Sequence, residues 1–379
     1  MNKLSQYILL LIIITSCHNS FDGKANNALQ GNWIKEYYPE ETMIDEDLPP
    51  PDFFFKPNVL YTFQNDTLFD ANQFHNYNKK TKKNNYLGYK TKFIIKDSII
   101  YWYNTLTKQD IEYGKIKKFT NDTIYFENFM LVKEKAQQVY QNKFDAIIVT
   151  SSGCYGTCPI YNYRIEADGT FIYDGEKFTN IEGLYKGKIN KEYFNYFKKI
   201  LNQIDIKNLP NKYERLATDG NYEELVFVKD EKVIKKISFY LNDGPPKVKQ
   251  LLDILRLMDY YLEDKKPYQS QNYFSIQNPL YFYKTENGED FSNYQMFYLW
   301  TELMKHQTNP FKFTSKTIKI NNFRPNYYWN SEHKYFNPKS LESLETDHQR
   351  FQIKFKNEPI QYYDLGYNFL ENNNYYTNQ

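Results

Sequence analysis

Glycine, cysteine and histidine are scarce in this chain of 379 residues, with 14, 3 and 5 copies respectively. So few cysteines exclude a disulfide-rich scaffold, and the five scattered histidines nominate no catalytic triad. The charge is nearly balanced at a formal +2, so the basic excess typical of nucleic-acid binding is missing. The common nucleophile, zinc and nucleotide motifs are missing too. We therefore expect no enzyme, no cofactor, no resident metal and no nucleic-acid partner.

Long apolar runs are missing as well. The run Tyr7–Ile14 is too short to cross a bilayer, which takes about 20 residues. Lys3 precedes it and the small residues Thr15 and Ser16 lead into Cys17, an order that predicts a secretory signal. The segment resembles the lipobox of bacterial lipoproteins. That resemblance implies a signal peptide over residues 1–17 with a lipidated Cys17, and the alternative is an uncleaved signal anchor or a buried strand.

A lipid anchor would place the protein in the cell envelope, since acyl chains contribute about 0.8 kcal/mol for each buried CH₂. The segment Ser20–Asn27 is polar and small, so we expect residues 18–28 to be a tether. Acidic pairs directly after the lipidated cysteine act as surface-export signals in some bacteria, but only Asp22 is acidic here. We therefore expect an outer-membrane location facing the periplasm. The membrane is the expected partner, and the sequence leaves any ligand or protein partner open.

Aromatic residues are abundant, at 19% of the chain, and they favour half-buried strands. In residues 29–138, short alternating runs are separated by turn pairs such as Asn65-Asp66 and Lys96-Asp97, which predicts an antiparallel β-barrel-like domain. Its opening, with Gly31 and Trp33, resembles the lipocalin-like domains of exported lipoproteins. The interior of such a barrel is either filled by side chains or open to an apolar ligand.

The following segments combine strands with helices, so the predicted fold class is α+β and mainly β. Residues 144–264 contain a hairpin around Asp168-Gly169 and a helix capped by Asn190, which predicts a two-layer α+β sandwich. Residues 268–379 predict a helix over Phe291–His306 and strands at Lys316–Ile320 and Phe351–Phe355. This C-terminal α+β region is either a small third domain or an elaboration of the second.

The only compact motif runs from Gly153 to Tyr161, at the turn between two predicted strands. Here the chain resembles a domain of unknown function found in envelope lipoproteins of the Bacteroidota, whose pattern is Gly-Cys-aromatic-Gly-x-Cys-Pro-x-Tyr. The resemblance covers roughly residues 145–261 and implies an extracytoplasmic lipoprotein, without an activity to carry over. The matching residues are Gly153, Cys154, Gly156, Cys158, Pro159, Tyr161, Asp168, Gly169 and Gly183.

The pair Cys154 and Cys158 carries two competing predictions. With Cys17 taken by the lipid, an isolated pair in an oxidising compartment is expected to form a disulfide, worth about 2 kcal/mol for so short a loop. In the alternative, Cys-x-x-x-Cys-Pro resembles the copper-binding and thiol-redox loop of Sco-type assembly factors. In those proteins the loop leads into a helix, whereas here Ile160–Ala167 is predicted to be a strand. We therefore expect a non-enzymatic binding or interaction module, and the alternative is a periplasmic thiol-redox or copper protein.

Overall fold

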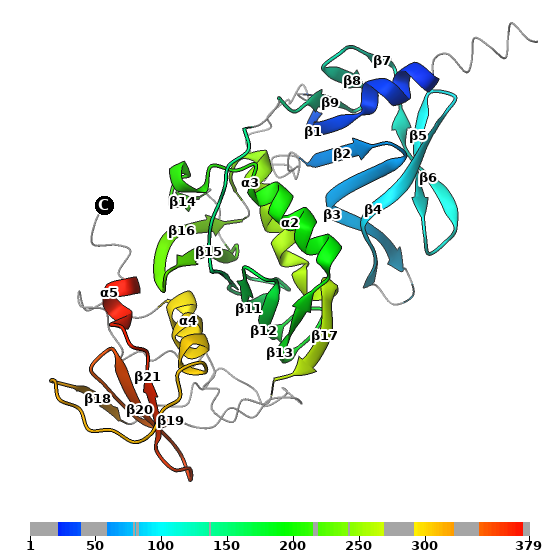
Figure 1. The fold of residues 1–379 in the computed structure, drawn as a ribbon. Coiled ribbons are helices and arrows are strands. Elements are labelled where there is room, and N and C mark those ends of the chain that lie inside the picture. Colours follow the sequence, from blue (N-terminus) through cyan, green and yellow to red (C-terminus); the bar gives the residue numbers. More distant parts are fainter. Residues whose placement is uncertain are drawn as a thin grey trace, which may run out of the picture. The chain divides into compact units, whose positions relative to one another are not determined.

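The structure of the chain is a computed structural model that describes residues 22–38, 59–78, 80, 83–135, 138–214, 219–241, 243–268, 292–321 and 341–373. The chain divides into two compact units. Unit 1 comprises Met1–Val139 and Pro245–Ile254, and unit 2 comprises Tyr140–Gly244 and Leu255–Gln379. Strands predominate in the described residues, as predicted (Figure 1).

Unit 1 is built on one curled antiparallel sheet of nine strands, in the order β6-β5-β4-β3-β2-β1-β9-β8-β7 (Figure 1). The predicted turns are confirmed, because Asn65 and Asp97 adopt positive φ angles of 55° and 53° in the β2–β3 and β4–β5 hairpins. The curled sheet agrees with the predicted fold class. The strands are β1 (Gly31–Tyr37), β2 (Leu60–Gln64), β3 (Thr67–Asn78), β4 (Lys83–Lys96), β5 (Ile99–Asn104), β6 (Gln109–Lys115), β7 (Lys118–Phe119), β8 (Thr123–Tyr125) and β9 (Phe129–Lys133).

The curled sheet encloses a core of aromatic and aliphatic side chains. Trp33 is fully buried, and its indole N–H donates to the backbone oxygen of Leu29 at 2.5 Å. Leu29 ends a helix over residues 22–29, where the sequence suggested a tether, and Ala25 in that helix is also buried. The core consists of Ala25, Leu29, Trp33, Tyr61, Phe63, Leu68, Phe74, Phe93, Ile100, Ile116, Ile124, Phe126 and Leu131. Side chains therefore fill the concave face at these positions.

Unit 2 contains an eight-stranded sheet in the order β14-β16-β15-β10-β11-β12-β13-β17. The predicted hairpin turn is confirmed by Gly169 at φ 83°, and Asn190 caps α2 by accepting from the backbone N–H groups of Glu192 and Tyr193. Its elements are β10 (Ala146–Ser151), β11 (Ile160–Glu166), β12 (Thr170–Lys177), β13 (Gly183–Ile189), α2 (Lys191–Leu201), η2 (Ile206–Asn208), β14 (Lys212–Tyr213), β15 (Tyr222–Lys229), β16 (Lys232–Tyr240), η3 (Met258–Tyr261) and β17 (Leu262–Pro267). The helix α3 (Pro246–Arg256) has its first nine residues in unit 1 and its last two in unit 2.

The C-terminal region packs on one face of this sheet. Its helix α4 (Asn293–Leu303) begins at a capping box formed by Ser292 and Gln295, and its Phe297 and Trp300 share a core with Ile148, Val226 and other sheet residues. It also has a four-stranded sheet of β18 (Ile318–Asn321), β19 (Leu341–Thr346), β20 (Arg350–Phe355) and β21 (Gln361–Asp364), followed by α5 (Phe369–Asn373). Residues of α4 and of this four-stranded sheet therefore share one hydrophobic core with the eight-stranded sheet. Within the described ranges, no helix has the length and apolar character needed to cross a membrane.

Candidate functional site

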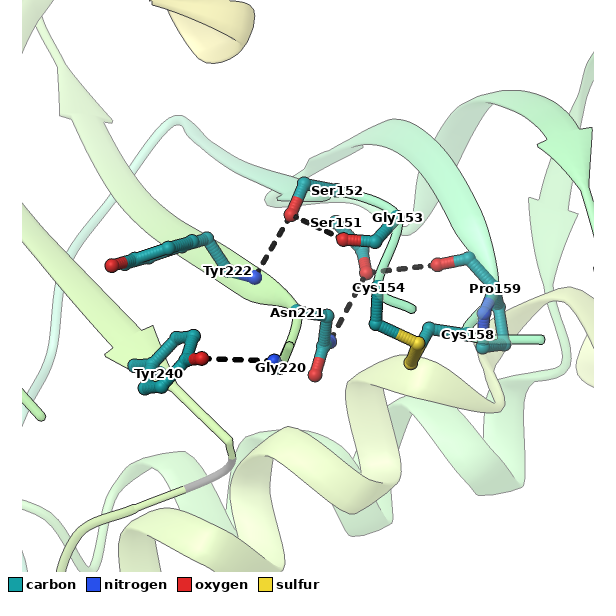
Figure 2. The surroundings of a disulfide bond; sticks show 10 residues. All are labelled: Ser151, Ser152, Gly153, Cys154, Cys158, Pro159, Gly220, Asn221, Tyr222 and Tyr240. Carbon is teal, nitrogen blue, oxygen red and sulfur yellow. Dashed lines mark hydrogen bonds between the residues drawn. A yellow bond between two sulfur atoms is a disulfide. The ribbon is translucent and has the colours of Figure 1, made fainter. Parts of the chain in front are cut away.

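Cys154 and Cys158 lie in the loop that joins β10 to β11, and their sulfur atoms are bonded (Figure 2). Their Cα atoms are 5.6 Å apart, within the usual range for a disulfide. The apolar strand β10 is buried along its whole length, and the chain becomes polar at Ser151-Ser152 before it turns. A Cβ on Gly153 would lie 3.2 Å from the Ile160 side chain, so glycine lets the loop fold back closely on the start of β11.

Hydrogen bonds fix the two ends of the disulfide loop to the sheet. The hydroxyl of Ser151 donates to the backbone oxygen of Pro159 at 2.9 Å, which ties the last residue of β10 to the start of β11. The hydroxyl of Ser152 accepts from the backbone N–H of Tyr222 at 2.9 Å, which joins the loop to β15 (Figure 2). The loop is therefore held by backbone and side-chain contacts in addition to the disulfide.

The disulfide loop is exposed at its tip. The side chain of Tyr155 is 91% exposed, whereas both cysteines are half-buried. The loop runs from one strand into another, as the sequence predicted, and does not lead into a helix. The arrangement can therefore display an aromatic side chain on a short closed loop, which is a geometry suited to recognition.

Tyr161, the last residue of the motif, lies in a buried polar cluster at the same end of the sheet. Its hydroxyl donates to Glu223 on β15 at 3.1 Å, and Arg256 binds both oxygens of the same carboxylate. Burial and the charge of Glu223 raise the pKa of Tyr161 well above its usual value, so the phenol stays neutral. The ring of Tyr161 stacks on Tyr163 with centroids 5.5 Å apart. The motif tyrosine therefore has a structural role in joining the loop to the core.

These strands and the disulfide loop lie within a part of the chain that matches a known family model. Residues 145–258 match the model of a domain of unknown function (DUF6438). A DUF6438 domain is present here. It covers under a third of the chain and assigns no activity to it.

Two curated relatives show weaker similarity. The methionine–tRNA ligases of Borrelia duttonii (strain Ly) and Borrelia recurrentis (strain A1) are each 24% identical to this chain over 192 residues. The aligned region is 48% of this chain but only 24% of each ligase, so the chain spans about a quarter of the length of these relatives. No solved structure matches the chain. These comparisons leave the DUF6438 domain as the one family assignment.

Several residues considered from the sequence do not join this site. Cys17, His18 and His333 lie outside the described residues. The ring Nδ1 of His306 is 2.8 Å from the backbone oxygen of Glu302, just after the end of α4 and not in the disulfide loop. In the described ranges, no three histidine, cysteine or acidic side chains group together as metal ligands.

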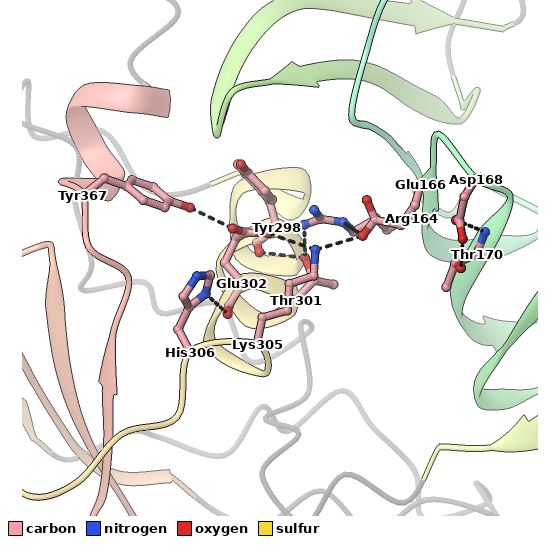
Figure 3. Close-up of polar contacts among 10 residues, drawn as sticks. All are labelled: Arg164, Glu166, Asp168, Thr170, Tyr298, Thr301, Glu302, Lys305, His306 and Tyr367. Carbon is pink, nitrogen blue, oxygen red and sulfur yellow. Dashed lines mark hydrogen bonds and ion pairs between the residues drawn. The ribbon is translucent and has the colours of Figure 1, made fainter.

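The structure adds a buried ion-pair network that sequence reasoning missed (Figure 3). Arg164 on β11 binds Glu302 on α4 at 2.5 Å and Glu166 at 2.8 Å, and Arg164 and Glu302 are both almost fully buried. The hydroxyl of Tyr367 donates to the second oxygen of Glu302 at 2.9 Å. Burial raises the pKa of Glu302, but the charges of Arg164 and Lys305, together with the hydrogen bonds from Arg164 and Tyr367, lower it by more, so the net pKa is lowered. The network fixes α4 on the DUF6438 sheet. No local pattern reveals it, because its members are 138 residues apart.

A second buried group missed by the sequence is Asp259 in η3. It is 5% exposed, its Oδ2 is 3.4 Å from the hydroxyl of Tyr173, and its Oδ1 has no hydrogen-bond partner. Burial raises the pKa of Asp259 to about 6. The folded chain therefore keeps a proton that the unfolded chain releases near pH 4, at about the usual aspartate pKa.

The raised pKa of Asp259 predicts a pH-dependent stability. The free energy of unfolding should fall by about 3 kcal/mol as the pH rises from about 4 to about 6, and this contribution should stay constant above that. An Asp259→Asn variant should lose this dependence and be up to about 3 kcal/mol more stable than the wild type at neutral pH. Urea denaturation of both proteins across this pH range measures the difference. An equal pH slope in the two proteins would contradict the prediction.

Proposed function

We propose that the chain is a lipid-anchored cell-envelope protein whose DUF6438 domain is a non-enzymatic binding or interaction module. The observation that carries the proposal is the closed Cys154–Cys158 loop between two strands, which suits an oxidising compartment outside the cytoplasm. The Lys3, Tyr7–Ile14 and Cys17 pattern supports export and lipidation. We further propose that the anchor lies in the outer membrane and that the folded units face the periplasm.

The contact surface of this module is proposed to be the disulfide loop. Tyr155 extends into solvent from a loop that is tied to β11 and β15, so little conformational freedom would be lost on binding. Tyrosine is enriched at protein interfaces because one end of its ring is apolar and the other is polar. The partner of this loop would be a protein or another component of the cell envelope.

The proposal predicts that Cys154 and Cys158 are closed in essentially every molecule in the cell. Acid-quenched envelope protein, alkylated before and after reduction and weighed by intact mass spectrometry, should gain no alkyl group at first and two after reduction. Opening the loop by Cys154→Ser and Cys158→Ser should cost only about 2 kcal/mol, because the closed loop is short.

The alternative, a thiol-redox or copper protein that uses the same two cysteines, predicts a different result. A redox site would give a mixed or largely open pair in cells, and a copper site would bind one Cu(I) for each reduced pair. Either outcome would replace the binding module as the proposed function. A closed pair together with no stoichiometric Cu(I) binding by the reduced protein would support the binding module.

A further inference from the structure

The folded part of unit 1 begins close to Cys17 in the sequence. Asp22, five positions after Cys17, starts the helix over residues 22–29 (blue in Figure 1), and Ala25 and Leu29 of this helix are buried in the core of the unit. Five residues reach at most about 18 Å when fully extended, whereas a domain of this size is roughly 35 Å across. A lipid on Cys17 would therefore hold the end of unit 1 that carries Asp22 close to the bilayer.

The start of this helix lies at the turn of the β4–β5 hairpin. The Asp22 carboxylate accepts from the backbone N–H of Ser98 at 3.3 Å, and the backbone oxygen of Ser98 accepts from the N–H of Ile116 at 2.7 Å. Ser98 is in the turn between β4 and β5, and Ile116 directly follows β6. The two hydrogen bonds therefore bring the helix start, this turn and the end of β6 together at one end of unit 1.

Exposed lysines gather at this end of the unit. Lys96 on β4 lies directly opposite Ile99 on β5, and Ile99 lies opposite Lys115 on β6, so the three side chains share one face of the sheet. The next residue of β5, Ile100, is buried in the core, so the shared face is the outer one. Lys96 and Lys115 are exposed, as is Lys24 in the helix, and Ile99 is half-buried.

Charge changes along β6 with distance from this end. Two acids, Asp22 and Asp97, lie among the three lysines, and the Asp22 carboxylate already accepts from a backbone N–H. Lys115 is at the near end of β6, whereas Glu112 and Asp110, which are also exposed, follow farther along the strand. The basic end is therefore the end nearest the proposed lipid, an arrangement that favours contact with an anionic surface there.

We propose that this end of unit 1 is a membrane-docking surface that contacts anionic lipid headgroups through Lys24, Lys96 and Lys115. The inference rests on the proposed lipidation of Cys17 and adds to it the side of the protein that faces the bilayer. Lysines near a negatively charged leaflet are attracted to it, and Ile99 between two of them adds an apolar contact at the headgroup level. High salt screens such contacts, so they orient unit 1 and supplement the acyl anchor without replacing it.

Fluorescence quenching on the full lipidated chain in vesicles tests this surface. Lys96→Cys offers a single free thiol for a fluorophore, because Cys154 and Cys158 are bonded to each other and Cys17 would carry the lipid. The matched control is Lys108→Cys, an exposed lysine in the turn at the other end of β5, roughly 17 Å away at about 3.4 Å per residue. In vesicles that contain phosphatidylglycerol and nitroxide-labelled headgroups, the label on Lys96→Cys should be quenched at least about threefold more than the label on the control.

A second labelled variant and a second lipid keep the test decisive. Lys115→Cys should be quenched like Lys96→Cys, and it replaces that variant if the latter does not fold. Neutral phosphatidylcholine in place of phosphatidylglycerol should lower the quenching of either label at least about twofold, because the lysines lose their anionic partner. Equal quenching of the Lys96→Cys and Lys108→Cys labels, or equal quenching in the two kinds of vesicle, would overturn the docking surface. A protein mass without an acyl group on Cys17 would instead contradict the proposed anchor, and this inference with it.

Discussion

Replacing Arg164 with methionine is expected to lower the free energy of unfolding by about 3–5 kcal/mol, because it leaves Glu302 buried without its counter-charge. The side chains of Arg164 and Glu302 are 5% and 4% exposed, so water cannot replace the lost partner. The variant also removes the bonds from Arg164 to Glu166 and to the hydroxyl of Thr301. The loss should appear as weaker packing of α4 on the DUF6438 sheet.

Urea denaturation of single and double variants measures this effect. Arg164→Met combined with Glu302→Leu should recover most of the lost stability, since an apolar pair can replace a buried ion pair at little cost. Lys188→Met is the matched control: its ion pair with Asp168 is more than half exposed and should contribute less than about 1 kcal/mol. A single variant as stable as this control would show that the network does not hold α4 in place.

Removing the lipid anchor is expected to move the protein almost completely out of the membrane fraction. The variant to use carries Cys17→Ala and has residues 1–16 replaced by a secretory signal that is cleaved directly before residue 17. The exported chain then has neither the lipid nor the apolar run Tyr7–Ile14. Without acyl chains, which contribute about 0.8 kcal/mol for each buried CH₂, nothing in the proposed anchor would remain.

Fractionation after a high-salt wash measures this change, with Cys154→Ala as a control that keeps Cys17 and should stay in the pellet. An unlipidated chain that still sediments with washed membranes would point instead to a membrane-binding surface on the folded units.

Local features were predictable from the sequence because they rest on neighbouring residues. Asn190 caps α2 as predicted, and the β11–β12 hairpin turns at the predicted Asp168-Gly169 pair. The strand β17, Leu262–Pro267, was missed because its charged residues and proline do not resemble a strand. It forms because β13 would otherwise be the edge strand of the sheet, and β17 pairs with it in the antiparallel direction.

The long-range features could not be predicted from one sequence. Nothing local links Arg164 to Glu302, and nothing local shows that α4 covers the second face of the sheet. The bond between Cys154 and Cys158 could be predicted because the two residues are only four positions apart, which makes it a local contact. Asp22 and Ser98, 76 positions apart, come together only through the fold of unit 1.

The mass of the mature N-terminus, measured on protein extracted from the cell envelope, tests the central claim most directly. The account predicts that residues 1–16 are absent and that the first residue is Cys17 carrying a diacylglycerol group. A mature chain that retains residues 1–16, or that begins with an unmodified Cys17, would contradict the lipid-anchored envelope protein proposed for this sequence.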